Sequence, residues 1–265
     1  MCKLYFNYGT MNSGKSMLLL AKAYNFEERG IPYRIYKSSI DTRDKGVIHS
    51  RALGDRECYT IGPKESFFAK CYWYNTDVKW LMVDEAQFLT EKQVDELATI
   101  VDECGIDVIC YGLRTDFQTH LFPGSKRLFE IADTFEEIKS QCEDGNKNIF
   151  NARIDKEGNI VTEGEQIQVG AEDCYKSVSR KMYKRLKDLP RIRRLVRSSQ
   201  FDRLWKDVMM YERGVLFTEK ELDEAADAFQ NDDYSKAYEI LELYCGKSTP
   251  ELIDRKKKLE KQYGK

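Results

Sequence analysis

The stretch Gly9-Thr10-Met11-Asn12-Ser13-Gly14-Lys15-Ser16 constrains the fold more than any other, because it fits the P-loop pattern G-x-x-x-x-G-K-[ST]. Apolar and aromatic residues at 3–8 predict a buried strand before it, and residues 17–24 are rich in helix formers. A strand, a glycine loop and a helix together place backbone N–H groups and a positive helix end around phosphates. We therefore expect a bound nucleoside triphosphate, with Lys15 on the outer phosphates and Ser16 on Mg²⁺.

A pair of acids forms the second part of the predicted site. Asp84 ends an apolar run at residues 79–84, so we expect it to hold Mg²⁺ against the phosphates. Glu85 follows directly and could accept a proton from whatever attacks the γ-phosphoryl group, although a solvated loop acid is the simpler alternative. The attacker is water in an ATPase and a substrate hydroxyl in a kinase, and the spacing does not choose between them.

Alternating strands and helices predict an α/β fold, a RecA-like parallel sheet with its ligands at the carboxyl ends of the strands. The P-loop and Asp84 both lie at such ends and so indicate one site. The polar stretch from Asp41 to Arg56 has no clear period and predicts a loop. We expect strands at residues 3–8, 33–37, 79–84, 106–111 and 134–139, and helices at residues 17–24, 91–103 and 121–132.

We divide the chain at changes in composition into a P-loop domain at residues 1–140, a small β-rich subdomain at 141–183 and a helical extension at 184–265. In the subdomain we expect a hairpin over residues 154–161 and a short strand at residues 166–169. The extension begins with a basic segment and continues with an acidic one. The basic segment could bind nucleic acid, but we favour its packing against the acidic helix.

Composition narrows the classes of protein. The 265 residues carry a formal net charge of −2, so the chain as a whole has no excess of positive charge for binding polyanions. The eight cysteines are scattered, and the first strand leaves no room for a signal peptide, so we expect a cytoplasmic protein with free thiols. No apolar run approaches the length that spans a membrane.

Four motifs in order resemble the type II thymidine kinase family, over about residues 3–183. They are Gly9–Ser16 with Met11, Asp84-Glu85-Ala86-Gln87-Phe88, residues 111–118 and residues 121–125. Asp41-Thr42-Arg43 matches a further family motif. The resemblance implies ATP- and Mg²⁺-dependent phosphorylation of the 5′-hydroxyl of thymidine, and of deoxyuridine as well. It also implies a homotetramer and feedback by dTTP.

The resemblance assigns a role to each matching position. Glu85 would be the catalytic base, and Arg43 would steady charge near the transferring phosphoryl group. ATP would be bound by Gly9, Thr10, Met11, Asn12, Ser13, Gly14, Lys15, Ser16, Asp84, Glu85, Ala86 and Gln87. The nucleoside would be bound by Leu113, Phe88, Phe117, Phe122 and Tyr175, and by the backbone of Gln168, Val169 and Gly170. Tyr175 and the last three belong to the family's substrate-covering lasso, here the subdomain at 141–183. For each phenylalanine taken alone, ordinary core packing is the more frequent explanation.

The chain departs from the family at its structural zinc site. Cys142 is kept, but its expected partner falls near Asp144 or Gly145. Ser179 and Met182 stand at the positions of the second pair, and a hydroxyl with a thioether does not build the usual zinc site. We therefore predict that this chain binds no zinc.

Two other functions compete with this interpretation. One is a P-loop ATPase acting on nucleic acid, in which Glu85 activates water. We disfavour it because the chain is too short for a second motor lobe. The other is a nucleotide-binding scaffold with little activity, against which the intact Lys15, Ser16, Asp84 and Glu85 argue.

Overall fold

The computed structural model describes residues 1–41, 46–50, 52–155, 160–164, 166, 174–184 and 186–187. The chain divides into two compact units, Met1–Ser179 and Arg180–Lys265. Residues 180–184 and 186–187 of the second unit are helical. The rest of the predicted helical extension, with its basic and acidic segments, lies outside the described residues. The predicted boundary between residues 140 and 141 stays a prediction.

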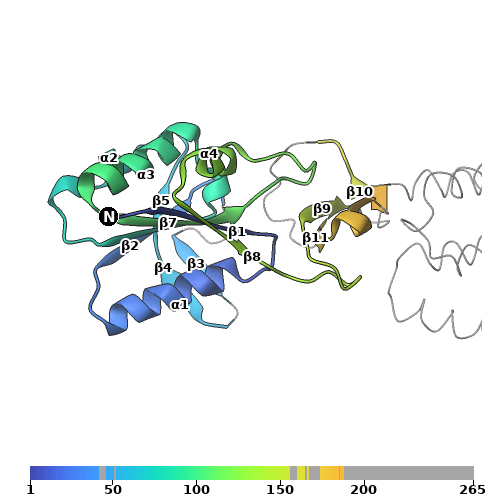
Figure 1. Cartoon of the computed structure of the whole chain (residues 1–265), viewed down its shortest axis with the longest axis horizontal. Helices are drawn as coiled ribbons and strands as arrows, with labels where there is room; N and C mark the ends of the chain where they lie inside the picture. The colour runs from blue at the N-terminus through green and yellow to red at the C-terminus, as the bar shows by residue number, and fades with distance from the viewer. Residues whose placement is uncertain are drawn as a thin grey trace, which may run out of the picture. The chain divides into compact units, whose positions relative to one another are not determined.

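Six parallel strands form the main sheet, in the order β5–β2–β6–β7–β1–β8 (Figure 1). The parallel α/β architecture predicted from the sequence is therefore confirmed. Strand β7 lies between the strand that leads into the P-loop, β1, and the strand that ends in the paired acids, β6. The strands are β1 (Leu4–Gly9), β2 (Tyr33–Ser38), β5 (Tyr59–Ile61), β6 (Trp80–Asp84), β7 (Asp107–Leu113) and β8 (Thr134–Ile138).

Helices cover both faces of this sheet, with α1 on one face and α3 and α4 on the other (Figure 1). Successive residues of a strand point to opposite faces, and β6 shows this directly. Met82 packs with α1 residues such as Leu19, whereas Leu81 and Val83 pack with the apolar stripe of α3. The helices are α1 (Lys15–Glu28), α2 (Phe67–Lys70), α3 (Glu91–Cys104) and α4 (Pro123–Ile131), with 3₁₀ turns η1 (Trp73–Asn75) and η2 (Ala86–Phe88).

Helix α3 shows why the sequence folds as it does beside the site. Thr90 and Gln93 form a capping box, in which the Thr90 hydroxyl accepts from Gln93 N at 3.2 Å and Gln93 Oε1 accepts from Thr90 N at 3.0 Å. Gly105 ends the helix in the left-handed conformation at a φ of 67°. These local signals fix both ends of the helix whose apolar stripe packs with Leu81 and Val83 of β6.

The expectation of a loop between Asp41 and Arg56 was wrong in part. The structure has an antiparallel hairpin there, formed by β3 (Val47–Ser50) and β4 (Gly54–Glu57). The strands have only four residues each, and polar residues interrupt their alternation, so no period stands out in the sequence. Ile48 anchors the hairpin, because its side chain is 1% exposed and packs into the core around α1.

A separate small sheet carries the end of the first unit. It consists of β9 (Phe150–Ile154), β10 (Ile160–Val161) and β11 (Tyr175–Val178) in the antiparallel order β10–β9–β11. Strands β9 and β10 confirm the expected hairpin, whose turn lies outside the described residues. Three of the four residues of the strand expected at 166–169 also lie outside them.

No helix in the described ranges is long and apolar enough to cross a membrane.

Candidate active site

The P-loop, Gly9–Ser16, joins β1 to α1. Gly14 precedes the helix in the left-handed conformation at a φ of 91°, and no acid stands in the first turn to compete with an anion. Gly9 is needed for close packing, since a Cβ there would lie 2.5 Å from Ser13 Oγ and 2.7 Å from Ile138 O. Lys15, 7% exposed, donates from Nζ to Thr10 O at 2.7 Å, which holds its ammonium group against the loop.

Asp84 at the end of β6 meets the P-loop directly. Ser16 Oγ donates to Asp84 Oδ2 at 3.3 Å, and Asp84 Oδ1 is buried with no hydrogen-bond partner in the described part of the chain. Burial raises the pKa of Asp84 and the charge of Glu85 raises it further, whereas the ammonium groups of Lys15 and Lys37 lower it. A buried carboxylate with an open oxygen beside a hydroxyl is the donor set that Mg²⁺ binds, so these residues fit the ion.

Glu85 is held in an unusual backbone conformation. Its φ of 52° and ψ of 39° place it in the left-handed region, which costs a non-glycine residue about 1 kcal/mol or more. Gln87 fixes the carboxylate by donating from Nε2 to Glu85 Oε2 at 2.5 Å, while its Oε1 accepts from Leu113 N at 2.9 Å. One buried amide thus ties the candidate base to the end of the neighbouring strand β7. Gln87, like Ala86, was predicted to bind ATP, and both are almost fully buried beneath the site.

The predicted aromatic residues lie in η2, in the loop after β7 and at the start of α4. Phe88 and Phe122 pack edge to face with ring centroids 5.7 Å apart, and Phe88 is half-buried. Leu113 is also half-buried at the end of β7. Phe117 is 1% exposed, and the Arg153 guanidinium carbon lies 3.7 Å from its ring centroid, so one face of the ring is covered by protein. Of the predicted wall residues, Phe88 and Phe122 are therefore in contact with each other, Leu113 is joined to Glu85 through Gln87, and Phe117 packs against Arg153.

Arg153 of the small sheet contacts Phe117 and also binds Tyr175 on the neighbouring strand. The Tyr175 hydroxyl accepts hydrogen bonds from Arg153 Nε at 2.9 Å and Nη2 at 2.5 Å, and the same guanidinium lies 5.2 Å from the Tyr175 ring centroid. Nearby, Gln166 Nε2 donates to Asp116 Oδ2 at 2.8 Å. The small sheet is thereby attached to the loop that follows β7. The remaining predicted site residues, Arg43 and residues 168–170, lie outside the described residues.

Comparison with known proteins decides the family. The family model described as "TK: Thymidine kinase" matches residues 2–183. The thymidine kinase of Pasteurella multocida is 43% identical over 187 residues, which cover 69% of this chain and 97% of that protein. This chain belongs to the thymidine kinase family. The thymidine kinase of Agrobacterium fabrum is 45% identical over 184 residues, covering 68% of this chain and 95% of that protein.

One solved structure that resembles this thymidine kinase family member does so only loosely. The genome packaging NTPase B204 from Sulfolobus turreted icosahedral virus 2, in complex with ATP-gammaS, is 15% identical and has a TM-score of 0.33. The overlay covers 54% of this chain and 78% of that one. At this level the overlay has no bearing on function.

The structure adds residues to the candidate active site that the sequence did not single out. Arg153 holds Tyr175 and Phe117, and Asn151 and Ser177 contact the backbone of the P-loop. Their one signal in the sequence is alternation: Asn151 and Arg153 are two residues apart, as are Tyr175 and Ser177. That spacing puts them on a common face only once the pairing of β9 with β11 is known.

A hydrogen bond joins the two chain segments where the kinase family's zinc is expected. Ser179 Oγ donates to Asp144 Oδ2 at 2.6 Å. Cys142 is buried, and in the described ranges no group of three or more His, Cys, Asp or Glu side chains is placed to hold a metal ion. The absence of zinc stays a prediction, but Asp144 and Ser179 give the small sheet a link that needs no metal.

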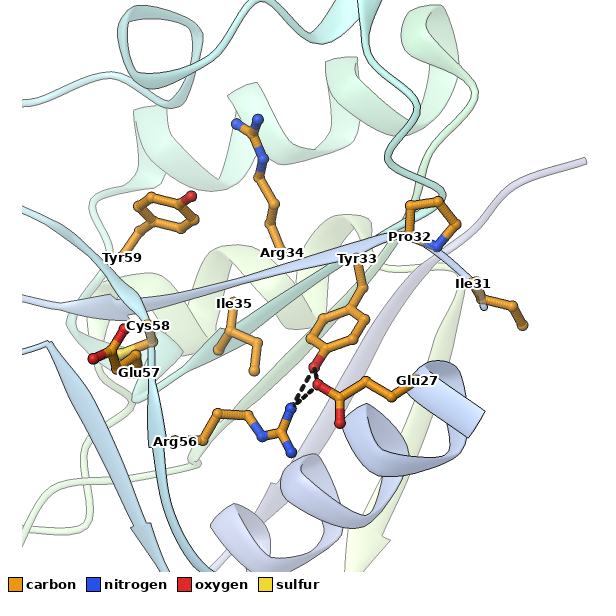
Figure 2. Close-up of a pocket in the computed structure, with 10 residues that line it drawn as sticks. All are labelled: Glu27, Ile31, Pro32, Tyr33, Arg34, Ile35, Arg56, Glu57, Cys58 and Tyr59. Carbon is orange, nitrogen blue, oxygen red and sulfur yellow. Dashed lines mark hydrogen bonds and ion pairs between the residues drawn. The ribbon is translucent and has the colours of Figure 1, made fainter. Parts of the chain in front are cut away.

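A further cavity, of about 470 Å³, is lined by residues of α1, β2, β4 and β5 (Figure 2). Tyr33 and Tyr59, the first residues of β2 and β5, line it, whereas the P-loop and Asp84 follow the opposite, carboxyl ends of their strands. Arg56 binds Glu27 and Tyr33 at its wall. Burial and the hydrogen bond to Glu27 raise the pKa of Tyr33 to about 12. No residue predicted for the active site lines this cavity.

Proposed function

We propose that this chain transfers the γ-phosphoryl group of ATP to the 5′-hydroxyl of thymidine. Membership in the thymidine kinase family makes it a phosphotransferase that uses thymidine and ATP. The observation that carries the residue-level proposal is the position of Glu85. Glu85 follows β6, the strand beside β7, and its carboxylate is held by the Gln87 side chain, which also binds Leu113 of the predicted nucleoside wall. A nucleoside against that wall would present its sugar to the carboxylate.

The transfer follows from these positions. The P-loop amides and Lys15 bind the triphosphate and neutralise charge that develops on the transferred group. The 5′-oxygen attacks the γ-phosphorus as its proton passes to Glu85, and the bond from the γ-phosphorus to the bridging oxygen breaks, so that ADP leaves. Ser16 and Asp84 would hold Mg²⁺, which would neutralise charge on the β- and γ-phosphates when bound. Arg43 is proposed to steady the same charge.

Several finer features rest on the family alone. We propose deoxyuridine as a second acceptor, a homotetramer as the assembly and dTTP as a feedback inhibitor. The backbone of residues 168–170 is proposed to bind the edge of the base. Zinc is proposed to be absent because Ser179 stands where a ligand is expected. The cytoplasm remains the expected compartment, supported by the free cysteines of the described residues.

A panel of nucleosides tests the proposal. Full-length protein is incubated with ATP, Mg²⁺ and one nucleoside at a time, and the monophosphate is separated by chromatography. We expect thymidine and deoxyuridine to be converted, with one ADP formed for each monophosphate. Parallel reactions contain single-stranded or double-stranded DNA in place of the nucleoside. ADP release stimulated by DNA, with no nucleoside monophosphate formed, would overturn the proposal in favour of an ATPase.

A further inference from the structure

One face of the small sheet carries residues that contact both halves of the candidate site. Ser177 lies directly opposite Asn151 in the pairing of β11 with β9, and Tyr175 lies opposite Arg153. Residues two apart on a strand share a face, so all four side chains stand on one side of the sheet. Arg153 lies over the ring of Phe117 and binds the Tyr175 hydroxyl. Asn151 and Ser177 reach the P-loop instead.

The contact with the P-loop is made to the main chain of a single residue, Met11. Asn151 Oδ1 accepts from Met11 N at 2.8 Å, and Ser177 Oγ donates to Met11 O at 2.8 Å. Ser177 Oγ is also 3.2 Å from Asn151 Oδ1, so the three groups form a closed set. The amide orientation of Asn151 is fixed, because turning it over would bring its NH₂ group against the N–H of Met11. Both backbone polar groups of Met11 are thus held by the small sheet.

The position of Met11 makes these bonds consequential. Asn12, the next residue, is in the left-handed conformation at a φ of 57°, so the loop makes its turn at this point. Asn151 is only 3% exposed, and a hydrogen bond with a buried acceptor is costly to leave unmade. A shift of β9 or β11 must therefore move the turn of the P-loop or break these bonds.

We propose that Asn151 and Ser177 are positioning residues that couple nucleoside binding to ATP binding through the backbone of Met11. The inference rests on the proposed function, since it takes the ligand held by Phe117 and Tyr175 to be the nucleoside. A nucleoside that fixes Tyr175 also fixes Ser177 two residues along the same strand, and with it the P-loop turn. Each ligand then binds more tightly when the other is present, by the same factor in both directions.

Calorimetry with thymidine lacking its 5′-hydroxyl measures the coupling, because that analogue cannot accept phosphate. The dissociation constant of ATP with Mg²⁺ is measured on the full chain with and without the analogue. We expect about fivefold or tighter ATP binding with the analogue in the wild-type chain, within the usual range for coupled sites. In Asn151→Ala and Ser177→Ala the ratio should fall toward one, and Ser177→Thr, which keeps the hydroxyl, should restore it.

Lys176→Ala is the matched control, because Lys176 lies between Tyr175 and Ser177 on the same strand and points to the other face, where it binds Glu143. It should keep the wild-type ratio. A wild-type ratio of one, or a ratio unchanged in Asn151→Ala and Ser177→Ala, would overturn the inference. Circular dichroism establishes whether each variant is folded. If Asn151→Ala does not fold, Ser177→Ala, which is the milder change, still tests the coupling.

Hydrogen exchange tests the coupling without any nucleoside, so it separates this inference from the proposed function. Adding ATP and Mg²⁺ should slow amide exchange in β9 and β11 of the wild-type chain and of Lys176→Ala. The slowing should be absent in Asn151→Ala. Equal slowing in all three would show that Asn151 transmits nothing. Failure of the nucleoside panel with this exchange pattern intact would refute the substrate but not the coupling.

Discussion

Glu85 reaches its position through main-chain conformation, and Gln87 then holds its carboxylate. The left-handed φ of 52° turns the side chain of Glu85 away from the course of β6. Gln87 Oε1 accepts a hydrogen bond from Leu113 N, and Gln87 Nε2 donates to Glu85 Oε2. Gln87 therefore orients the Glu85 carboxylate relative to β7. The two acids therefore stand in different environments. Asp84 stays buried beside Ser16, and Glu85 is half-buried where a substrate could reach it.

Glu85→Gln tests the base at this scale. The amide has almost the same shape but cannot take up a proton, so we expect the thymidine kcat to fall about 10²- to 10⁴-fold. The dissociation constant for ATP should change little, because the P-loop is untouched. Steady-state kinetics and calorimetry measure the two quantities. Glu91→Gln, an exposed acid in the first turn of α3, is the control and should keep wild-type turnover.

The sequence alone was enough to locate the P-loop and the two acids, because each motif consists of a few consecutive residues. It did not reveal Asn151, Arg153 or Ser177. Asn151 and Ser177 contact Met11 from 140 and 166 residues away, and nothing near them in the chain announces the contact. The cover that Arg153 puts on Phe117 depends in the same way on tertiary packing.

At the level of elements, the turn η2 and the start of α4 must approach each other closely. A Cβ on Gly124 would lie 2.6 Å from Ala86 O, 2.7 Å from Leu89 O and 3.0 Å from Gln87 O. These atoms belong to backbone that cannot swing aside, so Gly124 is required for packing. The sequence placed this glycine in a motif, but only the structure shows the contact that requires it.

Gly124→Ala should therefore destabilise the fold by about 1–3 kcal/mol, the usual cost of overpacking a close contact. Urea unfolding followed by circular dichroism gives the free energy of unfolding. Lys126→Ala, on the same helix and 58% exposed at its side chain, is the control and should change stability little. An unchanged midpoint for Gly124→Ala would mean that η2 and α4 are not packed as described.

The link between Asp144 and Ser179 gives the small sheet a pH dependence. Burial would raise the pKa of Asp144, but hydrogen bonds from Ser179 and Asn146 outweigh it and hold the pKa below its usual range. A lowered pKa in the folded state stabilises above the unfolded value of about 3.9, and this stabilisation is lost as the pH falls through the folded value. Asp144→Asn should therefore lower stability at pH 7 and progressively less below about pH 4.

Urea unfolding of Asp144→Asn and wild type between pH 3 and pH 7 measures this difference. Glu143→Gln is the control, since its exposed ion pair with Lys176 is 40% and 53% exposed at its two side chains and adds little. A constant difference between Asp144→Asn and wild type over this range would contradict the role of the carboxylate. Addition of a strong zinc chelator should leave the wild-type curve unchanged if no metal supports the sheet.

On the scale of the whole molecule, the family match stops well before the end of the chain. It covers residues 2–183, and the matched Pasteurella multocida protein is covered over 97% of its length. The residues that follow have no counterpart in that relative. Their sequence predicts helices, but no motif in them carries chemistry, which is why their role could not be predicted.

A chain ending at Lys187 should therefore retain thymidine phosphorylation, because the candidate site lies wholly within the first unit. Initial rates give kcat/KM for the shortened and full chains, and light scattering gives their assembly states. Loss of activity in a shortened chain that is still folded would show that the extension contributes to catalysis. A changed assembly state with unchanged activity would locate its contribution in oligomerisation.

The place of β7 in the sheet has a consequence for how such an enzyme can diversify. The P-loop follows β1, the proposed base Glu85 follows β6, and Leu113 ends the strand between them. Neighbouring strands are about 4.8 Å apart, so the main-chain hydrogen bonds between β6, β7 and β1 fix the distance between the P-loop and Glu85 across the sheet. Side chains around β7 can vary to admit different bases. The main-chain pairing keeps the P-loop and Glu85 in place when those side chains change.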